Sequence, residues 1–173
     1  MSLAPRTPDL KANLDINNGT FGTLLGSASI GSIIMLLIGG QIVHRIGAKR
    51  SMQIGSTAVA IVYTGLVNTS SPILFLILNI FAGASISIYH IATSGHSLHR
   101  QDEVEAVIIP KLHGAWAVGA MSTSVIAFLI SNSVSISSHI TILMFVVWLL
   151  TQFCINKLAP TFPDNPTSDD DYQ

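Results

Sequence analysis

The sequence predicts an all-α fold, a polytopic transmembrane bundle of about five helices. Hydrophobic residues make up 49% of the 173 residues and charged residues only 10%, whereas soluble domains carry roughly 25% charged residues. The mean hydropathy is +0.58. Three long stretches, residues 16–43, 51–99 and 112–156, contain no charged residue. A spanning helix needs roughly 20 mostly apolar residues, so the first stretch holds one span and each of the others holds a helical hairpin.

The same composition excludes several other classes of protein. The net charge is -1 and the sequence has no long basic cluster, so we expect no nucleic-acid partner. A single cysteine, Cys154, excludes an internal disulfide and a site built from several cysteines. The histidines have no convincing metal-ligand spacing. We therefore expect no metal, no cofactor and no enzymatic activity.

Each expected element follows from local composition. Residues 1–18 are polar and carry prolines, so we expect an external segment there rather than a cleavable signal peptide. The first span, residues 19–43, is rich in small residues, and Gly22 and Gly26 form a GxxxG pair that is expected to let another helix approach closely. A short basic loop, residues 44–50, is expected to connect the first span to the second.

The rest of the chain alternates apolar runs with polar turns. Four further spans are expected, at residues 51–67, 72–94, 112–130 and 138–158. Pro72 begins the third span after a polar turn, and a second polar turn follows residue 130. Residues 95–111 are predicted to form a longer loop. The Pro-, Ser- and Asp-rich tail, residues 159–173, is predicted to be disordered and cytoplasmic.

The basic residues predict the orientation of the bundle. Six of the eight Lys and Arg residues fall on one side of the expected topology: Arg45, Lys49, Arg50, Arg100, Lys111 and Lys157. Only Arg6 and Lys11 fall on the other side. Cytoplasmic loops are enriched in Lys and Arg, so the N-terminus is predicted to be outside and the C-terminus inside. The lipid bilayer is therefore the first expected partner, and we expect a bacterial inner (plasma) membrane.

The strongest local motif joins the first two spans and runs Gly39-Gly-Gln-Ile-Val-His-Arg-Ile-Gly-Ala-Lys-Arg50. Basic side chains of this loop could bind the carbonyls at a helix C-terminus, which carry a partial negative charge. Gly47 could supply a left-handed turn. The alternative interpretation is a basic loop that only sets the topology.

This motif resembles the loop signature of the major facilitator superfamily, G-x-x-x-D-R-x-G-x-[KR]-[KR]. The matching residues, which the resemblance implies form a gating loop, are Gly40, Arg45, Gly47, Lys49 and Arg50. His44 stands where the family has an acidic residue, which weakens the charge relay that the resemblance implies.

Three further stretches resemble the family, and two of them resemble its sugar-permease-like branch around the fucose permeases. Residues 6–11 with residues 19–22 resemble the segment after the first family helix, and residues 111–119 resemble the start of the fifth. Asn79 stands where many members have an arginine, four residues before Gly83. The resemblance covers roughly residues 4–158 in order.

The resemblance implies that residues 19–158 correspond to family helices two to six of an N-terminal half. The first helix and the second six-helix half would then be missing, and residues 1–18 would lie at the end of the missing first helix. The implied activity is transport of a small, sugar-like or other polar solute by alternating access, with the missing C-terminal half or a second chain as partner. The implied pathway residues are Asn79, Gly83 and Trp116.

Alternatives remain for these residues and for the function. Polar residues inside spans either face a cavity or hold helices together, so Asn79 could equally join two helices. Trp116 could be an interfacial anchor or a packing residue. The whole chain could instead be a membrane interaction or assembly subunit, or a non-functional truncated gene product. A membrane-embedded enzyme or haem protein would need paired histidines or carboxylates at matching depth, which the sequence does not show.

Overall fold

The computed structural model describes residues 3–105, 107–131 and 133–158. Every regular element in these ranges is a helix, which confirms the predicted all-α class. The elements are η1 (Ala4–Arg6), α1 (Thr7–Leu14), α2 (Asn18–Gly26), α3 (Ala28–Ile46), α4 (Ala48–Asn68), α5 (Pro72–Val104), α6 (Ile109–Ile130) and α7 (Ile136–Asn156). The predicted tail, residues 159–173, lies outside the described residues.

Four helical segments in the described ranges are long and apolar enough to cross a membrane. They are Asn18–Ile46, Pro72–Gln101, Ile109–Ile130 and Ile136–Asn156. Helix α4 forms where the second span is expected and has 21 residues, a length of about 31 Å at about 1.5 Å per residue. It is long enough to span but less apolar than the other four segments, so its crossing of the membrane stays a prediction.

Polar caps begin the predicted helices at the two expected turns. The hydroxyl of Ser71 accepts a hydrogen bond from the backbone N–H of Leu74 at 3.4 Å, and Pro72 occupies the first helical position. The hydroxyl of Ser135 likewise accepts from the N–H of Ser138 at 3.2 Å. These side chains satisfy backbone donors that the first helical turn leaves without partners.

The predicted loop over residues 95–111 is wrong for most of its length. Helix α5 continues to Val104, and Glu105 ends it in the left-handed conformation with φ 48°. Charged pairs one turn apart support this extension: Glu103 pairs with His99, at 3.1 Å between Nε2 and Oε1, and with Arg100. Such pairs stabilise a helix outside the apolar run, where hydropathy no longer marks it.

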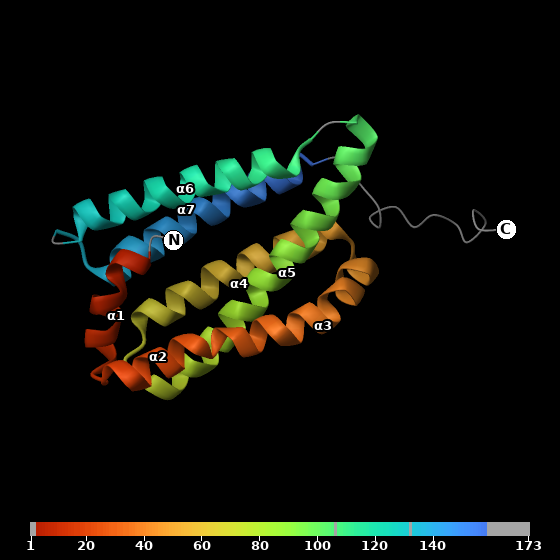
Figure 1. The fold of residues 1–173 in the computed structure, drawn as a ribbon. Helices are drawn as coiled ribbons and strands as arrows, with labels where there is room; N and C mark the ends of the chain where they lie inside the picture. The colour runs from red at the N-terminus through yellow and green to blue at the C-terminus, as the bar shows by residue number, and fades with distance from the viewer. Residues whose placement is uncertain (1–2, 106, 132, 159–173) are drawn as a thin grey trace.

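The helices pack around α5 and α4. Helix α5 packs against both α3 and α4, and α4 packs in turn against α7. Figure 1 shows α1 at the end of the bundle where α4 ends and α7 begins, and the α3–α4 connection at the opposite end. The apolar core has one cluster near each end. The first contains Leu10, Leu14, Phe21, Leu24, Leu66, Val67, Phe75, Ala82, Ile136 and Ile140, and the second contains Val43, Ala48, Met52, Ile88, Ala92 and Ile155.

Candidate functional site

The signature loop makes a tight connection between α3 and α4. Gly47 separates the two helices with φ 87° and ψ 152°. Its positive φ favours glycine, although its ψ lies outside the left-handed helical region. The N–H of Gly47 donates to the carbonyl of Val43 at 2.9 Å, and the carbonyl of Gly47 accepts from the Ser51 hydroxyl at 2.8 Å. One glycine therefore ends α3 and starts α4.

The basic residues of this loop have different surroundings. The ammonium of Lys49 donates to the carbonyls of Asn156 at 3.1 Å and Leu158 at 3.3 Å, both at the C-terminal end of α7. The sequence motif indicated such a contact, in which a basic side chain binds the carbonyls at a helix C-terminus. Arg45 and Arg50 are exposed. Lys49 thus fixes the loop to α7 and leaves two guanidinium groups on the surface.

Gly40 and His44 lie on the last two turns of α3, ahead of this connection. Both residues are exposed. A Cβ at Gly40 would have no heavy atom within 4 Å. Gly40 therefore leaves an open place on the surface of α3 rather than a contact within the chain.

Asn79 is buried between α5 and the α2–α3 junction, with 8% of its surface exposed. Its side-chain nitrogen donates to the carbonyls of Leu24 at 2.8 Å and Leu25 at 2.9 Å, and lies 3.3 Å from the hydroxyl oxygen of Ser27. Ser27 is the single residue between α2 and α3. These contacts favour the interpretation of Asn79 as a residue that joins two helices.

Gly83 lies where α3 and α5 approach most closely. A Cβ at Gly83 would be 1.9 Å from the carbonyl oxygen of Ala28, and one at Gly31 would be 1.8 Å from that of Ile80. The hydroxyl of Ser32 also donates to the carbonyl of Gly83 at 3.2 Å. Only glycine permits backbones to come this close, so Gly83 acts here in helix packing.

The GxxxG prediction for Gly22 and Gly26 is wrong within this chain. Both residues are exposed, and a Cβ at either one would have no heavy atom within 4 Å. The close packing uses Gly31 and Gly83 instead. A one-dimensional glycine spacing does not say which face of a helix meets a neighbour, and here the pair lies on the open face.

Trp116 lines a groove of about 320 Å³ between α4, α6 and α7. Its side chain is exposed, with 54% of its surface accessible. The groove is lined by Leu3, Tyr63, Trp116, Gly119, Ala120, Thr123, Ile140, Leu143, Met144 and Val147. Of the three predicted pathway residues, Trp116 is the one that faces an open space, whereas Asn79 and Gly83 lie at helix contacts.

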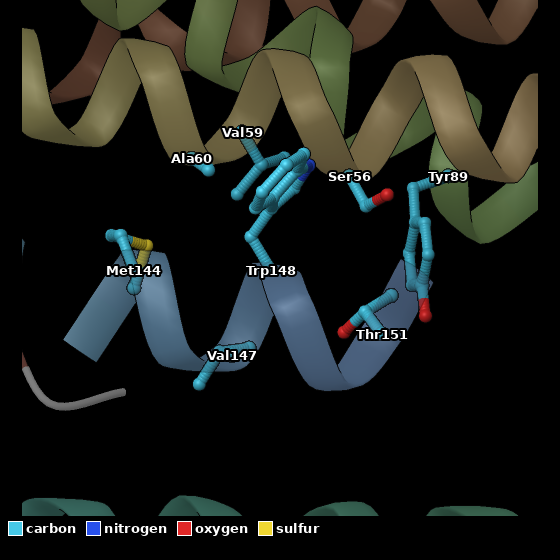
Figure 2. A pocket seen from close by; sticks show the side chains of 8 residues that line it. All are labelled: Ser56, Val59, Ala60, Tyr89, Met144, Val147, Trp148 and Thr151. Carbon is cyan, nitrogen blue, oxygen red and sulfur yellow. The ribbon is translucent and has the colours of Figure 1, made fainter. Parts of the chain in front are cut away.

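A smaller pocket of about 160 Å³ shares Met144 and Val147 with this groove. Its lining residues are Ser56, Val59, Ala60, Tyr89, Met144, Val147, Trp148 and Thr151. Figure 2 shows the Trp148 indole reaching from α7 toward α4, with the hydroxyl groups of Tyr89 and Thr151 at the same side of the pocket. The pocket therefore combines an aromatic ring with hydroxyl groups inside an apolar bundle.

A line of polar side chains joins α4 to α7 beside this pocket. The indole N–H of Trp148 donates to the Thr57 hydroxyl at 2.9 Å. The amide of Gln152 donates to the hydroxyls of Thr57 at 3.0 Å and Ser56 at 3.2 Å. This contact explains why α4 is more polar than its neighbours. Sequence reasoning missed it, although the polar residues of α4 recur at helical spacing.

The sequence also did not reveal the burial of Arg6. Only 2% of its surface is exposed, and its guanidinium bonds Asp9 and the carbonyl of Val134. The second partner lies 128 positions away in the sequence. The nearby Asp9 is the only local signal that could have suggested a buried ion pair.

The comparisons with known proteins identify the family. The Major Facilitator Superfamily profile matches residues 1–97, which covers α1 to α4 and most of α5. No curated protein and no solved structure matches the chain. The profile covers more than half of the sequence and includes the signature loop, in a chain with four apolar helical segments that could cross a membrane. The chain therefore belongs to the major facilitator superfamily and is an integral membrane protein of a transporter family.

Proposed function

We propose that this chain supplies helices two to six of an alternating-access transporter for a small, neutral, sugar-like solute, and that it needs further helices to transport. The family match supports the transport class. The resemblance of residues 6–11, 19–22 and 111–119 to sugar-permease-like members supports the branch and the solute class. Family transporters carry their substrate between two six-helix halves, and by the resemblance the described helices α2 to α7 correspond to helices two to six of one half.

The packing of α6 is the observation that carries the need for another helix. Within the described residues, Ala127 is the buried residue of α6, whereas α5 has a neighbour on two sides, α3 and α4. The groove beside α6 is lined mainly by apolar side chains, and Leu3, the first described residue, lies in its wall. An additional apolar helix would cover the exposed surface of α6, and the first family helix that the resemblance implies would be its source.

The signature loop would bias the inward- and outward-facing states. Lys49 holds the loop to the end of α7, so the loop and α7 would move together. The exposed guanidinium groups of Arg45 and Arg50 would meet the second half of the transporter. Because His44 replaces the family's acidic residue, this loop would depend more on Arg45 and Arg50 than on a carboxylate relay.

Solute contacts would come from the groove and the smaller pocket. Trp116 offers an aromatic face beside the hydroxyl of Thr123, and Tyr89 and Thr151 add further hydroxyl groups. An aromatic ring with nearby hydroxyl groups suits a neutral polyhydroxylated molecule better than an ion. Asn79 would contribute only its side-chain oxygen to a pathway, because its side-chain nitrogen already donates to two backbone carbonyls of α2.

We further propose the inner membrane of a bacterium as the location, with the N-terminus outside. The end of the bundle that carries Lys49 and Arg50 would then be cytoplasmic, and the end that carries Arg6 would be external. The Lys and Arg distribution supports this orientation.

A membrane assembly subunit is the second candidate function. The open surface at Gly22 and Gly26 supports it, because exposed small residues let a second helix approach closely in lipid. In this case the partner would bind α2 and no solute would be carried.

Uptake of radiolabelled neutral monosaccharides in cells separates these functions. We expect no uptake by the chain alone. Uptake should appear on co-expression with the first helix and the C-terminal half of a sugar-permease-like family member, and W116A should reduce it. Uptake by the chain alone would contradict the need for further helices. No uptake from a complex that co-purifies would contradict the solute class and favour the assembly subunit.

A further inference from the structure

Helix α5 has two exposed sides of opposite character. In its first half the exposed residues are apolar, namely Ile73, Leu74, Ile77 and Phe81. In its second half His90 and Ser94, one turn apart, are exposed. Each residue of a helix turns by about 100°, so Phe81 and His90, which are nine residues apart, point to opposite sides of α5. One exposed side is therefore apolar and the other carries polar groups.

Helices α3 and α4 pack against α5 between these two sides (Figure 1). A Cβ at Gly39 of α3 would lie 2.6 Å from Cδ1 of Ile91, and one at Gly55 of α4 would lie 3.1 Å from Cβ of Tyr89. His90 stands between these two contact residues in the sequence and points about 100° away from each. It therefore faces neither α3 nor α4.

The same contacts give the depth of His90 in the bundle. Its two neighbours in the sequence contact Gly39 and Gly55, and each of these glycines lies eight residues from Gly47, the connection between α3 and α4. Eight residues of helix measure about 12 Å. His90 thus lies inside this end of the bundle, within the apolar segment Pro72–Gln101 that is long enough to cross a membrane.

An exposed histidine at this depth does not suit a surface in contact with lipid. Ionisable side chains inside a membrane are costly, and they face the interior of a bundle or a water-filled cavity. The opposite side of α5, with Ile77 and Phe81, is apolar and suits lipid directly. The polar side of α5 therefore requires water or polar groups against it.

We propose that the side of α5 that carries His90 and Ser94 is the wall of a water-filled vestibule, which opens at the Gly47 end of the bundle. The imidazole of His90 and the hydroxyl of Ser94 offer donors and acceptors there to the hydroxyl groups of a neutral solute. The binding of a solute rests on the proposed function, whereas the presence of water does not.

The vestibule adjoins a solute contact that we have already proposed. The rings of His90 and Tyr89 meet edge to face, with 6.2 Å between their centroids, and Tyr89 lines the smaller pocket beside Trp148. A solute that leaves this pocket past Tyr89 would therefore meet His90 next.

Thiol labelling tests whether water reaches His90. In the full chain, C154S removes the native thiol and H90C places one at the vestibule wall. N-ethylmaleimide reacts with the ionised form of a thiol, and apolar surroundings suppress that ionisation. In membranes we expect H90C to react at least about tenfold faster than a thiol that faces lipid.

Two exposed positions provide matched controls. F81C lies on the opposite side of α5, and L150C replaces an α7 residue that is 60% exposed. Position 150 lies at the depth of the vestibule, because Gln152, two residues further along α7, donates to the Ser56 hydroxyl at 3.2 Å, and Ser56 follows the α4 glycine that contacts α5. A rate for H90C as low as that of L150C would overturn the vestibule. Equal rates for H90C and F81C would overturn the two-sided assignment of α5.

Uptake tests the solute contact in the complex with the first helix and the C-terminal half. H90A should raise the KM for the transported monosaccharide by about threefold to tenfold, the factor expected for the loss of one hydrogen bond. H90Q keeps a donor and an acceptor and should restore most of the affinity. An unchanged KM in H90A would overturn the solute contact while the proposed function stands. No uptake by the unsubstituted complex would contradict the proposed function and the solute contact with it, whereas the labelling rates would still decide the vestibule.

Discussion

The side-chain nitrogen of Asn79 lies 2.8 Å from the backbone carbonyl oxygen of Leu24, across the contact between α5 and α2. This bond places a buried amide at the one-residue junction where α2 passes into α3. Carbonyls at such a junction need partners, because lipid offers none. Asn79 therefore satisfies the backbone of another helix, a role that its position in the sequence left open.

Replacing Asn79 with alanine should destabilise the bundle by about 1 to 3 kcal/mol, because the hydrogen bonds from its amide to the Leu24 and Leu25 carbonyls and to the Ser27 hydroxyl are lost, while the Leu24 carbonyl keeps the Ser27 hydroxyl as a donor. Unfolding of the purified protein in mixed micelles measures the change. N13A is the control, since Asn13 is exposed and should change the stability by less than about 0.5 kcal/mol. Equal stabilities for N79A and N13A would show that Asn79 does not hold the helices together.

The glycines should divide into two classes. G83A and G31A should destabilise the protein strongly, since each new Cβ would lie within 2 Å of a backbone oxygen that cannot move without separating α3 from α5. G22A and G26A should be neutral or stabilise by up to about 1 kcal/mol, because alanine favours helix and their surroundings are open. Thermal unfolding of the four variants measures this contrast. A loss of stability in G22A as large as that in G83A would contradict it.

These glycines show what could and could not be predicted from the sequence. The helices were predictable because apolar runs and polar turns are local features, and Pro72 marks the start of α5. The faces through which the helices pack were not predictable. Gly22 and Gly26 have the spacing expected for close packing but have no neighbour, whereas Gly31 and Gly83 each contact a residue some 50 positions away. The C-terminal end of α5 was not predicted, because the residues beyond the apolar run are held in the helix by charged pairs such as His99 with Glu103.

Only part of the candidate site was predictable from the sequence. The signature loop and Trp116 are visible in the sequence as a motif and an aromatic residue. The bond from Arg6 to Val134 and the line of polar groups between α4 and α7 join distant segments, so no local pattern reveals them.

Lys49 should anchor the last turn of α7, since its ammonium binds the carbonyls of Asn156 and Leu158. K49M should therefore speed hydrogen exchange of the backbone amides in the last turn of α7 by several-fold, as expected for the loss of about 1 kcal/mol. Exchange measured by mass spectrometry on the reconstituted protein tests this. R50M is the matched control, because Arg50 is exposed. Equal exchange in both variants would show that Lys49 does not fix α7.

The path of α4 through the membrane tests the account most directly, since α4 is the least apolar of the five expected spans. Alkaline phosphatase and green fluorescent protein are fused in turn after Arg50, Asn68 and Arg100. We predict phosphatase activity only after Asn68, and fluorescence after Arg50 and Arg100. The same reporter active after both Arg50 and Asn68 would show that α4 does not cross, and would contradict the five-span correspondence with the transporter family.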